Sequence, residues 1–139
     1  MKNIEALKNI YNDYNNGTSQ YYRHVLCKSV VCTDGVVALI EAGEAAWLFD
    51  EIAFAQIDKR ITRDPMLSRM QFWTMKSNGK GGATLFCERD SGDCAFTIDI
   101  EYTDFPFEAM ENGSVRLWVA PTSFDGASTT WVVYLPSEH

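Results

Sequence analysis

The feature that most constrains this chain is a change of hydrophobic period close to its midpoint. Before residue 64, apolar side chains such as Ile4, Leu7 and Tyr14 recur every three or four positions, which is typical of amphipathic helices. After residue 64 apolar and polar side chains alternate, which is typical of strands with one buried face. Helices followed by strands favour an α+β fold over an alternating α/β fold.

The first half predicts three or four helices, separated by residues that cap or break helices. They are expected at 2–14, at 20–26, from Thr33 or Asp34 to Gly43, and from Glu44 towards Asp64-Pro65. The second half predicts about five strands, at 70–76, 83–88, 94–102, 114–120 and 128–135. With 139 residues we expect one domain, in which helices from a mainly helical half (1–64) pack on one face of an antiparallel sheet formed by residues 65–139.

Negative charge is concentrated in residues 88–111, which hold eight acidic residues and only Arg89 against them. This stretch alone accounts for the net charge of −7. Because phosphate would be repelled, direct binding to nucleic acid is disfavoured. The acids either form a solvated sheet face or bind a basic partner in place of phosphates. The predicted partner-binding residues are Asp90, Asp93, Asp99, Glu101, Glu108 and Glu111.

A second candidate site surrounds the sequence YYRH, where tyrosine and arginine offer apolar surface and polar groups together. As an alternative to protein binding, these residues would form a small-molecule or nucleotide pocket, which could be enzymatic. The structural explanation is that the tyrosines pack against the core and Arg23 pairs with a carboxylate. The predicted ligand-binding residues are Tyr21, Tyr22, Arg23, His24, Asp34 and Trp47.

The cysteines and histidines give little support to a metal site or to nucleophilic catalysis. Cys27 and Cys32, like Cys87 and Cys94, lack the close spacing of structural zinc ligands, and His24 is the only internal histidine. We therefore expect no metal, no cofactor and no catalytic residues. Whether Cys87 and Cys94 pair across a hairpin is left open, although free thiols are expected in a reducing compartment.

The dipeptide Thr-Asp occurs twice, in VCTDGV (31–36) and in EYTDFPF (101–107). Aspartate in such positions most often caps a helix or closes a turn. We therefore predict that Asp34 caps a helix and that Asp104 fixes the turn before Phe105-Pro106. Catalysis by either carboxylate is the less favoured interpretation.

No apolar run approaches the ~20 residues of a membrane-spanning helix, and the charged N-terminus does not resemble a signal peptide. These features predict a cytoplasmic protein that does not contact membranes.

Several motifs in order resemble DUF6876, a bacterial and phage family of unknown function. They are YYRH, TDGV, AWLFDEIA with Gln56, QFW, EYTDFPF and LPSEH. The chain departs from the family pattern at Ala45-Ala46, where an aromatic residue is typical, and at His139, where the family has tyrosine. The resemblance implies a compact domain often carried by mobile elements and viruses.

The function expected from these observations is non-enzymatic binding of another protein. The sharpest form is an inhibitor of a basic, nucleic-acid-binding host-defence complex, with the acidic stretch as its binding surface. The third alternative is a structural subunit that acts as a homo-oligomer through Trp73 or Trp118.

Overall fold

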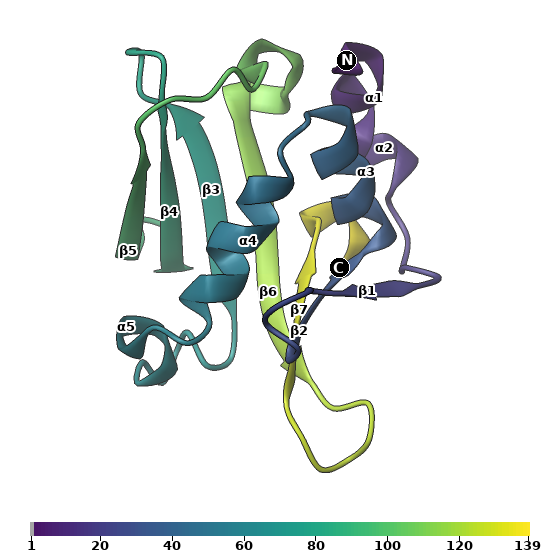
Figure 1. The fold of residues 1–139 in the computed structure, drawn as a ribbon, viewed down its shortest axis with the longest axis vertical. Helices are drawn as coiled ribbons and strands as arrows, with labels where there is room; N and C mark the ends of the chain where they lie inside the picture. Colours follow the sequence, from purple (N-terminus) through teal and green to yellow (C-terminus); the bar gives the residue numbers. More distant parts are fainter. Residues whose placement is uncertain (1) are drawn as a thin grey trace.

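The computed structural model describes residues 2–139, and within them the strands form a single seven-stranded sheet (Figure 1). The strands lie in the order β1-β2-β7-β6-β3-β4-β5. Their bounds are β1 Tyr21–Arg23, β2 Val30–Thr33, β3 Gln71–Ser77, β4 Ala83–Asp90, β5 Asp93–Ile100, β6 Ser114–Thr122 and β7 Thr130–Tyr134. Each neighbouring pair is antiparallel except β2 and β7, which are parallel.

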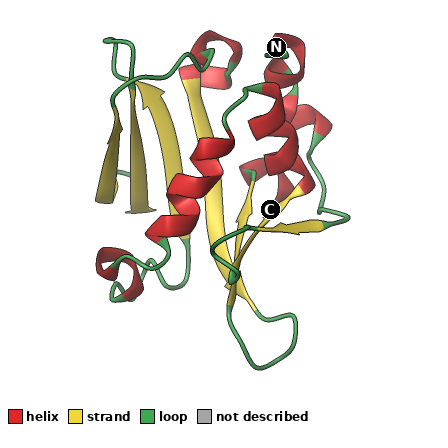
Figure 2. Cartoon of the chain, in the orientation of Figure 1, coloured by secondary structure: helices red, strands yellow, loops and turns green. Residues whose placement is uncertain are grey.

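The α-helices are short, and α3 and α4 lie across one face of the sheet (Figure 2). The α-helices are α1 Ile4–Lys8, α2 Ile10–Asp13, α3 Asp34–Ala42, α4 Ala46–Ala55 and α5 Lys59–Thr62, and the 3-10 helices are η1 Phe107–Ala109, η2 Glu111–Gly113 and η3 Pro136–Glu138. Within residues 2–139, no α-helix packs against the opposite side of the sheet, which we call the open face. The α+β class is therefore confirmed.

The predicted sheet is correct in its second half and incomplete in its first. All five predicted strands are present, with ends within two residues of the prediction. However, the sheet has seven strands and is mixed, not antiparallel with about five. Residues 21–23, predicted within a short helix, form β1, and β2 precedes α3. Both missed strands have four residues or fewer, too short to show a period.

The predicted helix at 2–14 is divided at Asn9, which ends α1 and begins α2. The Asn9 side-chain amide donates a hydrogen bond to the Glu5 carbonyl at 3.0 Å. Asparagine competes in this way for backbone groups that would otherwise continue the helix. The two short helices still bury Leu7 and Ile10 in the core.

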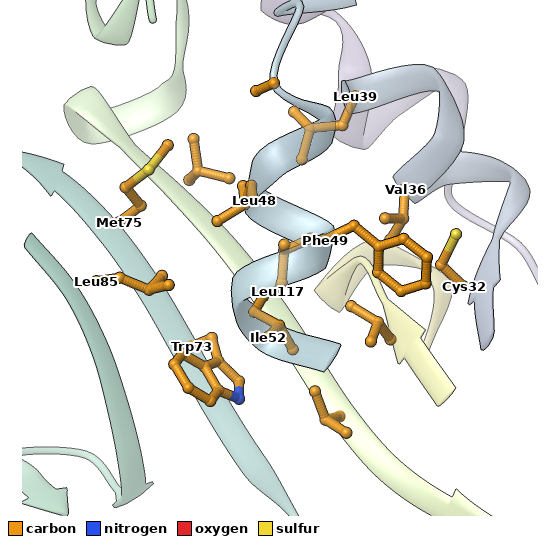
Figure 3. Packing of buried hydrophobic residues seen from close by; sticks show 14 of the residues in the cluster. Cys32, Val36, Leu39, Leu48, Phe49, Ile52, Trp73, Met75, Leu85 and Leu117 are labelled. Atoms are coloured by element: carbon orange, nitrogen blue, oxygen red, sulfur yellow. The ribbon is translucent and has the colours of Figure 1, made fainter. Parts of the chain in front are cut away.

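The core lies between α4 and the centre of the sheet (Figure 3). Leu48 and Ile52 of α4 face Trp73, Met75 and Leu117, which come from β3 and β6. Each such side chain stabilises the fold by about 1.5–3 kcal/mol when it is fully buried. Trp73 is only 1% exposed, so the prediction that it forms an oligomer contact is wrong.

The open face carries a row of rings on three adjacent strands. Phe72 of β3 opposes Trp118 of β6, which in turn opposes Tyr134 of β7. The Phe72 and Trp118 rings are 5.2 Å apart, and His139 stacks on Tyr134 at 5.8 Å. Trp118 is half-buried there, so the alternative of an oligomer through Trp118 stays a prediction.

Candidate partner-binding site

The first Thr-Asp pair joins β2 to α3. The Thr33 hydroxyl accepts a hydrogen bond from the Val36 amide at 3.4 Å and donates one to Glu138 Oε1 at 2.6 Å. Thr33 is therefore the helix cap, one of the two residues predicted for that role. Gly35, the residue after the Thr-Asp pair, packs against Leu135. A Cβ atom on Gly35 would be 2.7 Å from Leu135 Cδ1.

Asp34 holds the segment before β1 in place by hydrogen bonds. Its Oδ2 accepts hydrogen bonds from the Ser19 amide at 3.0 Å and the Ser19 hydroxyl at 2.7 Å, and its Oδ1 accepts one from the Tyr22 hydroxyl at 3.0 Å. The Ser19 donors lower the pKa of Asp34 to about 2. Asp34 is consequently a stable anion in a structural role. The prediction that Asp34 caps the helix is wrong, since its carboxylate joins the start of α3 to the segment before β1.

The YYRH stretch is divided by the alternation of β1. Tyr22 opposes Cys32, a core residue, and so lies on the helix side of the sheet, where it meets Asp34. Tyr21 and Arg23 lie on the open face. The Tyr21 ring is 5.0 Å from that of Phe124, and the Arg23 guanidinium donates a hydrogen bond to the Lys28 carbonyl.

His24 is buried, and both of its ring nitrogens are used by the fold. Nδ1 accepts hydrogen bonds from the backbone amides of Leu26 and Cys27 at 3.2 and 2.9 Å, so the proton lies on Nε2. Nε2 in turn donates to Asp50 Oδ1 at 2.7 Å. The imidazole thus builds the turn between β1 and β2 and links it to α4.

The six residues of the predicted ligand pocket do not converge. Tyr22 and Asp34 meet on the helix side, Tyr21 and Arg23 lie on the open face, and His24 is enclosed. The last of the six, Trp47, packs partly buried against the core from α4. The sequence alone does not determine on which face of the sheet each of these side chains lies, because a shift of one residue along a strand moves a side chain to the opposite face.

All four cysteines are free thiols. Burial raises the pKa of Cys32 and of Cys87 to about 12, so neither is a nucleophile at neutral pH. Cys87 belongs to the core, whereas Cys94 is exposed and lies opposite Glu88. Within residues 2–139, no three side chains of histidine, cysteine, aspartate or glutamate are grouped as metal ligands would be.

The six predicted partner-binding acids are all exposed, but they do not form one continuous face. They fall in three pairs: Asp90 and Asp93 at the β4–β5 turn, Asp99 and Glu101 at the other end of β5, and Glu108 and Glu111 in η1 and η2. The third pair precedes β6, which β3 and β4 separate from β5. The expectation of a single acidic sheet face therefore requires correction, because the chain leaves the sheet after residue 100.

The first two pairs nevertheless share one strand, β5, which ends the sheet (Figure 1). β5 has eight residues and pairs only with β4. Asp93 and Asp99 lie within it, and it holds no lysine or arginine. Glu101 follows its last residue, and Asp90, the last residue of β4, pairs with Asp93. We call β5 with these four carboxylates the acidic edge.

A cation compensates the acidic edge at one end only. Arg89 donates to Asp64 Oδ2 at 2.6 Å and to Asp93 Oδ1 at 3.0 Å. At the other end, no salt bridge within residues 2–139 involves Asp99 or Glu101. These two carboxylates are the part of the edge best placed to meet an external cation.

Fold and site together define a small α+β protein with motif carboxylates that serve structure and an acidic strand at one edge of its sheet. The chain belongs to the family of unknown function DUF6876, whose model matches residues 7–139. Comparison with curated proteins found no match, and comparison with solved structures found none. Within the described residues, no helix has the length and apolar character needed to cross a bilayer.

Proposed function

We propose that this protein is a non-enzymatic binding protein that captures a basic, extended segment of another protein along the acidic edge. The observation that carries this proposal is that β5 is a full-length strand at the end of the sheet whose charged side chains are all acidic. An edge strand leaves a row of backbone N–H and C=O groups without partners. An added strand would satisfy those groups with main-chain hydrogen bonds.

The charges select the kind of strand that is added. Lysine or arginine side chains on the incoming segment would meet Asp99 and Glu101 at one end of the edge and Asp90 at the other end. A second copy of β5 would instead bring its own carboxylates against them, and such like-charge contacts are unfavourable. The acidic edge is thus suited to a basic partner and unsuited to self-association.

The engagement of the ionisable motif residues supports binding over catalysis. Asp34 is held by Ser19 and Tyr22, and His24 by Asp50 and two backbone amides. A general acid or base needs a free position from which to exchange a proton with a substrate. These contacts supply a rigid frame for β1 and α3 instead.

The sharper form of the proposal is an inhibitor of a host-defence complex. Proteins that bind nucleic acid present basic segments to phosphates, and the acidic edge would occupy such a segment in their place. The resemblance to a family carried by mobile elements motivates this form, and the charge of the edge is compatible with it.

The test is fluorescence anisotropy with a labelled peptide of alternating lysine and threonine, equal in length to β5. We expect binding that weakens at high salt, because exposed charges are screened. Asp99→Lys combined with Glu101→Lys should weaken it by about tenfold or more, equivalent to at least about 1.4 kcal/mol. The matched control, Asp13→Lys with Glu41→Lys, makes the same change of net charge at exposed helix ends and should keep the affinity.

Strand addition is separated from simple charge attraction by N-methylation of the peptide. Methyl groups on alternate amides remove one row of main-chain donors and leave every lysine in place. One of the two alternate methylation patterns should abolish binding. Equal affinity for both methylated peptides, or equal losses in the edge and control variants, would show that the acidic edge does not capture a strand.

A further inference from the structure

We propose that a cavity at the opposite edge of the sheet binds a phosphate group carried by a small molecule. The cavity has a volume of about 410 Å³ and lies between the β1–β2 turn and the β6–β7 loop. It is lined by Arg23, Lys28, Ser29, Phe124, Asp125 and Ser128, together with the neighbouring threonines. In Figure 1 the β6–β7 loop projects beyond the sheet, below β1.

Two cations in this cavity are available to a ligand. Within residues 2–139, neither Arg23 nor Lys28 forms a salt bridge, whereas Lys2, Arg60 and Arg89 each pair with a carboxylate. The Arg23 guanidinium is oriented by the hydrogen bond from its Nη1 to the Lys28 carbonyl, which leaves Nε and Nη2 as further donors. A guanidinium held in this way offers the forked donor geometry that phosphate oxygens accept.

In two other cavities of this protein, the cation lies beside acids. The cavity at Arg116 includes Glu88 and Asp90, and the cavity at Lys76 includes Glu88. At Arg23 and Lys28 the balance is reversed, since Asp125 is the one acid against two cations. A local positive charge on a chain with net charge −7 favours an anionic ligand at this place.

Asp125 is committed to closing the β6–β7 loop. Its Oδ1 accepts hydrogen bonds from the amides of Ala127 and Ser128 at 2.8 and 2.9 Å, and its Oδ2 accepts one from the Ser128 hydroxyl at 2.9 Å. These donors hold the carboxylate in its charged form and lower its pKa to about 2. Asp125 therefore shapes the cavity wall, while its charge opposes an anion there and limits affinity.

The turn that carries Lys28 is held in place by contacts within the protein. His24 fixes the amides of Leu26 and Cys27, and its own amide donates to the Val30 carbonyl at 2.9 Å. Asp50 anchors the His24 ring from α4. A site held on such a frame loses little freedom on binding, which favours affinity for a small ligand.

Two exposed rings beside the cavity extend the site. Tyr21 and Phe124 are 49% and 55% exposed, and their centroids are 5.0 Å apart. Phe124 also lines the cavity. Because the two ring planes are tilted by 57°, a flat base could stack on one of them while its phosphate meets Arg23. A nucleotide and a simple phosphate ester therefore share the same anchoring chemistry.

The test is NMR titration of the labelled protein with inorganic phosphate, adenosine monophosphate and adenosine, at constant ionic strength. We expect phosphate and the nucleotide to shift the amide signals of the 24–29 turn and of the 123–129 loop. Tighter binding of the nucleotide than of phosphate would identify the rings as a base platform, and equal binding would assign the site to phosphate esters generally. Absence of shifts with both phosphate compounds, or equal shifts with adenosine, would overturn the proposal.

Variants assign the effect to the cations. Arg23→Gln and Lys28→Gln should each weaken phosphate binding by about tenfold, whereas Lys80→Gln, at an exposed hairpin tip, should not. Asp125→Asn removes the opposing charge and keeps one acceptor oxygen, so it should tighten binding. Unchanged affinity in both Arg23→Gln and Lys28→Gln, with a native spectrum, would refute the assignment. Since β1 and β5 lie at opposite ends of the sheet, these results do not depend on the acidic edge.

Discussion

The two Thr-Asp pairs use the same side-chain chemistry at different depths of the fold. In each pair the threonine hydroxyl accepts a hydrogen bond from a nearby backbone amide. Thr33 accepts one from Val36, and Thr103 accepts one from Phe105 at 3.2 Å. In each pair the aspartate reaches a segment far away in the sequence. Asp34 holds Ser19, and Asp104 accepts a hydrogen bond from Lys2 Nζ at 2.9 Å.

The difference lies in what surrounds the two carboxylates. Both oxygens of Asp34 accept hydrogen bonds from neutral donors. Thr33 is buried at the end of β2, and Asp34 is half-buried at the start of α3. The Asp104 side chain is 66% exposed, and its partner is the ammonium of Lys2. Water and salt compete with the second arrangement far more than with the first. The same dipeptide is therefore expected to matter much more in TDGV than in TDFPF.

The largest predicted effect concerns the residue after the first pair. In Gly35→Ala the new Cβ would lie 2.7 Å from Leu135 Cδ1 and 2.8 Å from the Glu138 carboxyl group. Because both neighbours are packed, we expect the free energy of unfolding to fall by about 1–3 kcal/mol in urea denaturation. Gly17→Ala is the control, since no atom beyond its two chain neighbours lies within 4 Å of its Cβ position. Equal stability of the two variants would show that the TDGV turn is not tightly packed.

The second prediction concerns acid stability through Asp34. Its pKa of about 2 lies below the ordinary 3.8, so the carboxylate stabilises the fold fully above pH 3.8 and loses this effect as pH falls through about 2. Asp34→Asn should lower the melting temperature at neutral pH and reduce the difference from wild type as the pH falls. A constant difference between the two proteins across this range would contradict the charged role of Asp34.

Sequence reasoning predicted the strands and the helix cap that a local pattern determines. It missed the features that depend on contacts between residues far apart in the sequence. The five long strands show alternation over several residues, and the cap at Thr33 follows from its position before an apolar run. β2 is different, because its four residues form a strand by pairing with the short β1 and with β7, about a hundred positions later. The same limit applies to YYRH, where β1 alternates Tyr21, Tyr22 and Arg23 between two faces.

The candidate site shows this limit more clearly. The sequence identified the acids around β5, but their separation from Glu108 and Glu111 depends on sheet order, which places β3 and β4 between them. The predicted role of Asp104 is also wrong. We predicted that its own carboxylate fixes the turn, whereas Thr103 does so and Asp104 reaches Lys2. No local signal in EYTDFPF indicates a lysine a hundred residues away.

The smallest predicted effect is that of Asp104→Asn, and it completes the comparison. The substitution removes one exposed ion pair with Lys2 and leaves the Thr103 hydrogen bond to Phe105 in place. The hydrogen bond from Lys2 lowers the pKa of Asp104, and the pKa of Lys2 is raised by Asp104 together with Glu44. We therefore expect a change in melting temperature clearly smaller than that of Asp34→Asn, and one that disappears at high salt. If Asp104→Asn destabilised the protein as strongly as Asp34→Asn at every salt concentration, burial would not be what separates the two pairs. The ion pair with Lys2 would then be as important for the position of residues 103–105 as the packing of Phe105 against Gly43 at the end of α3.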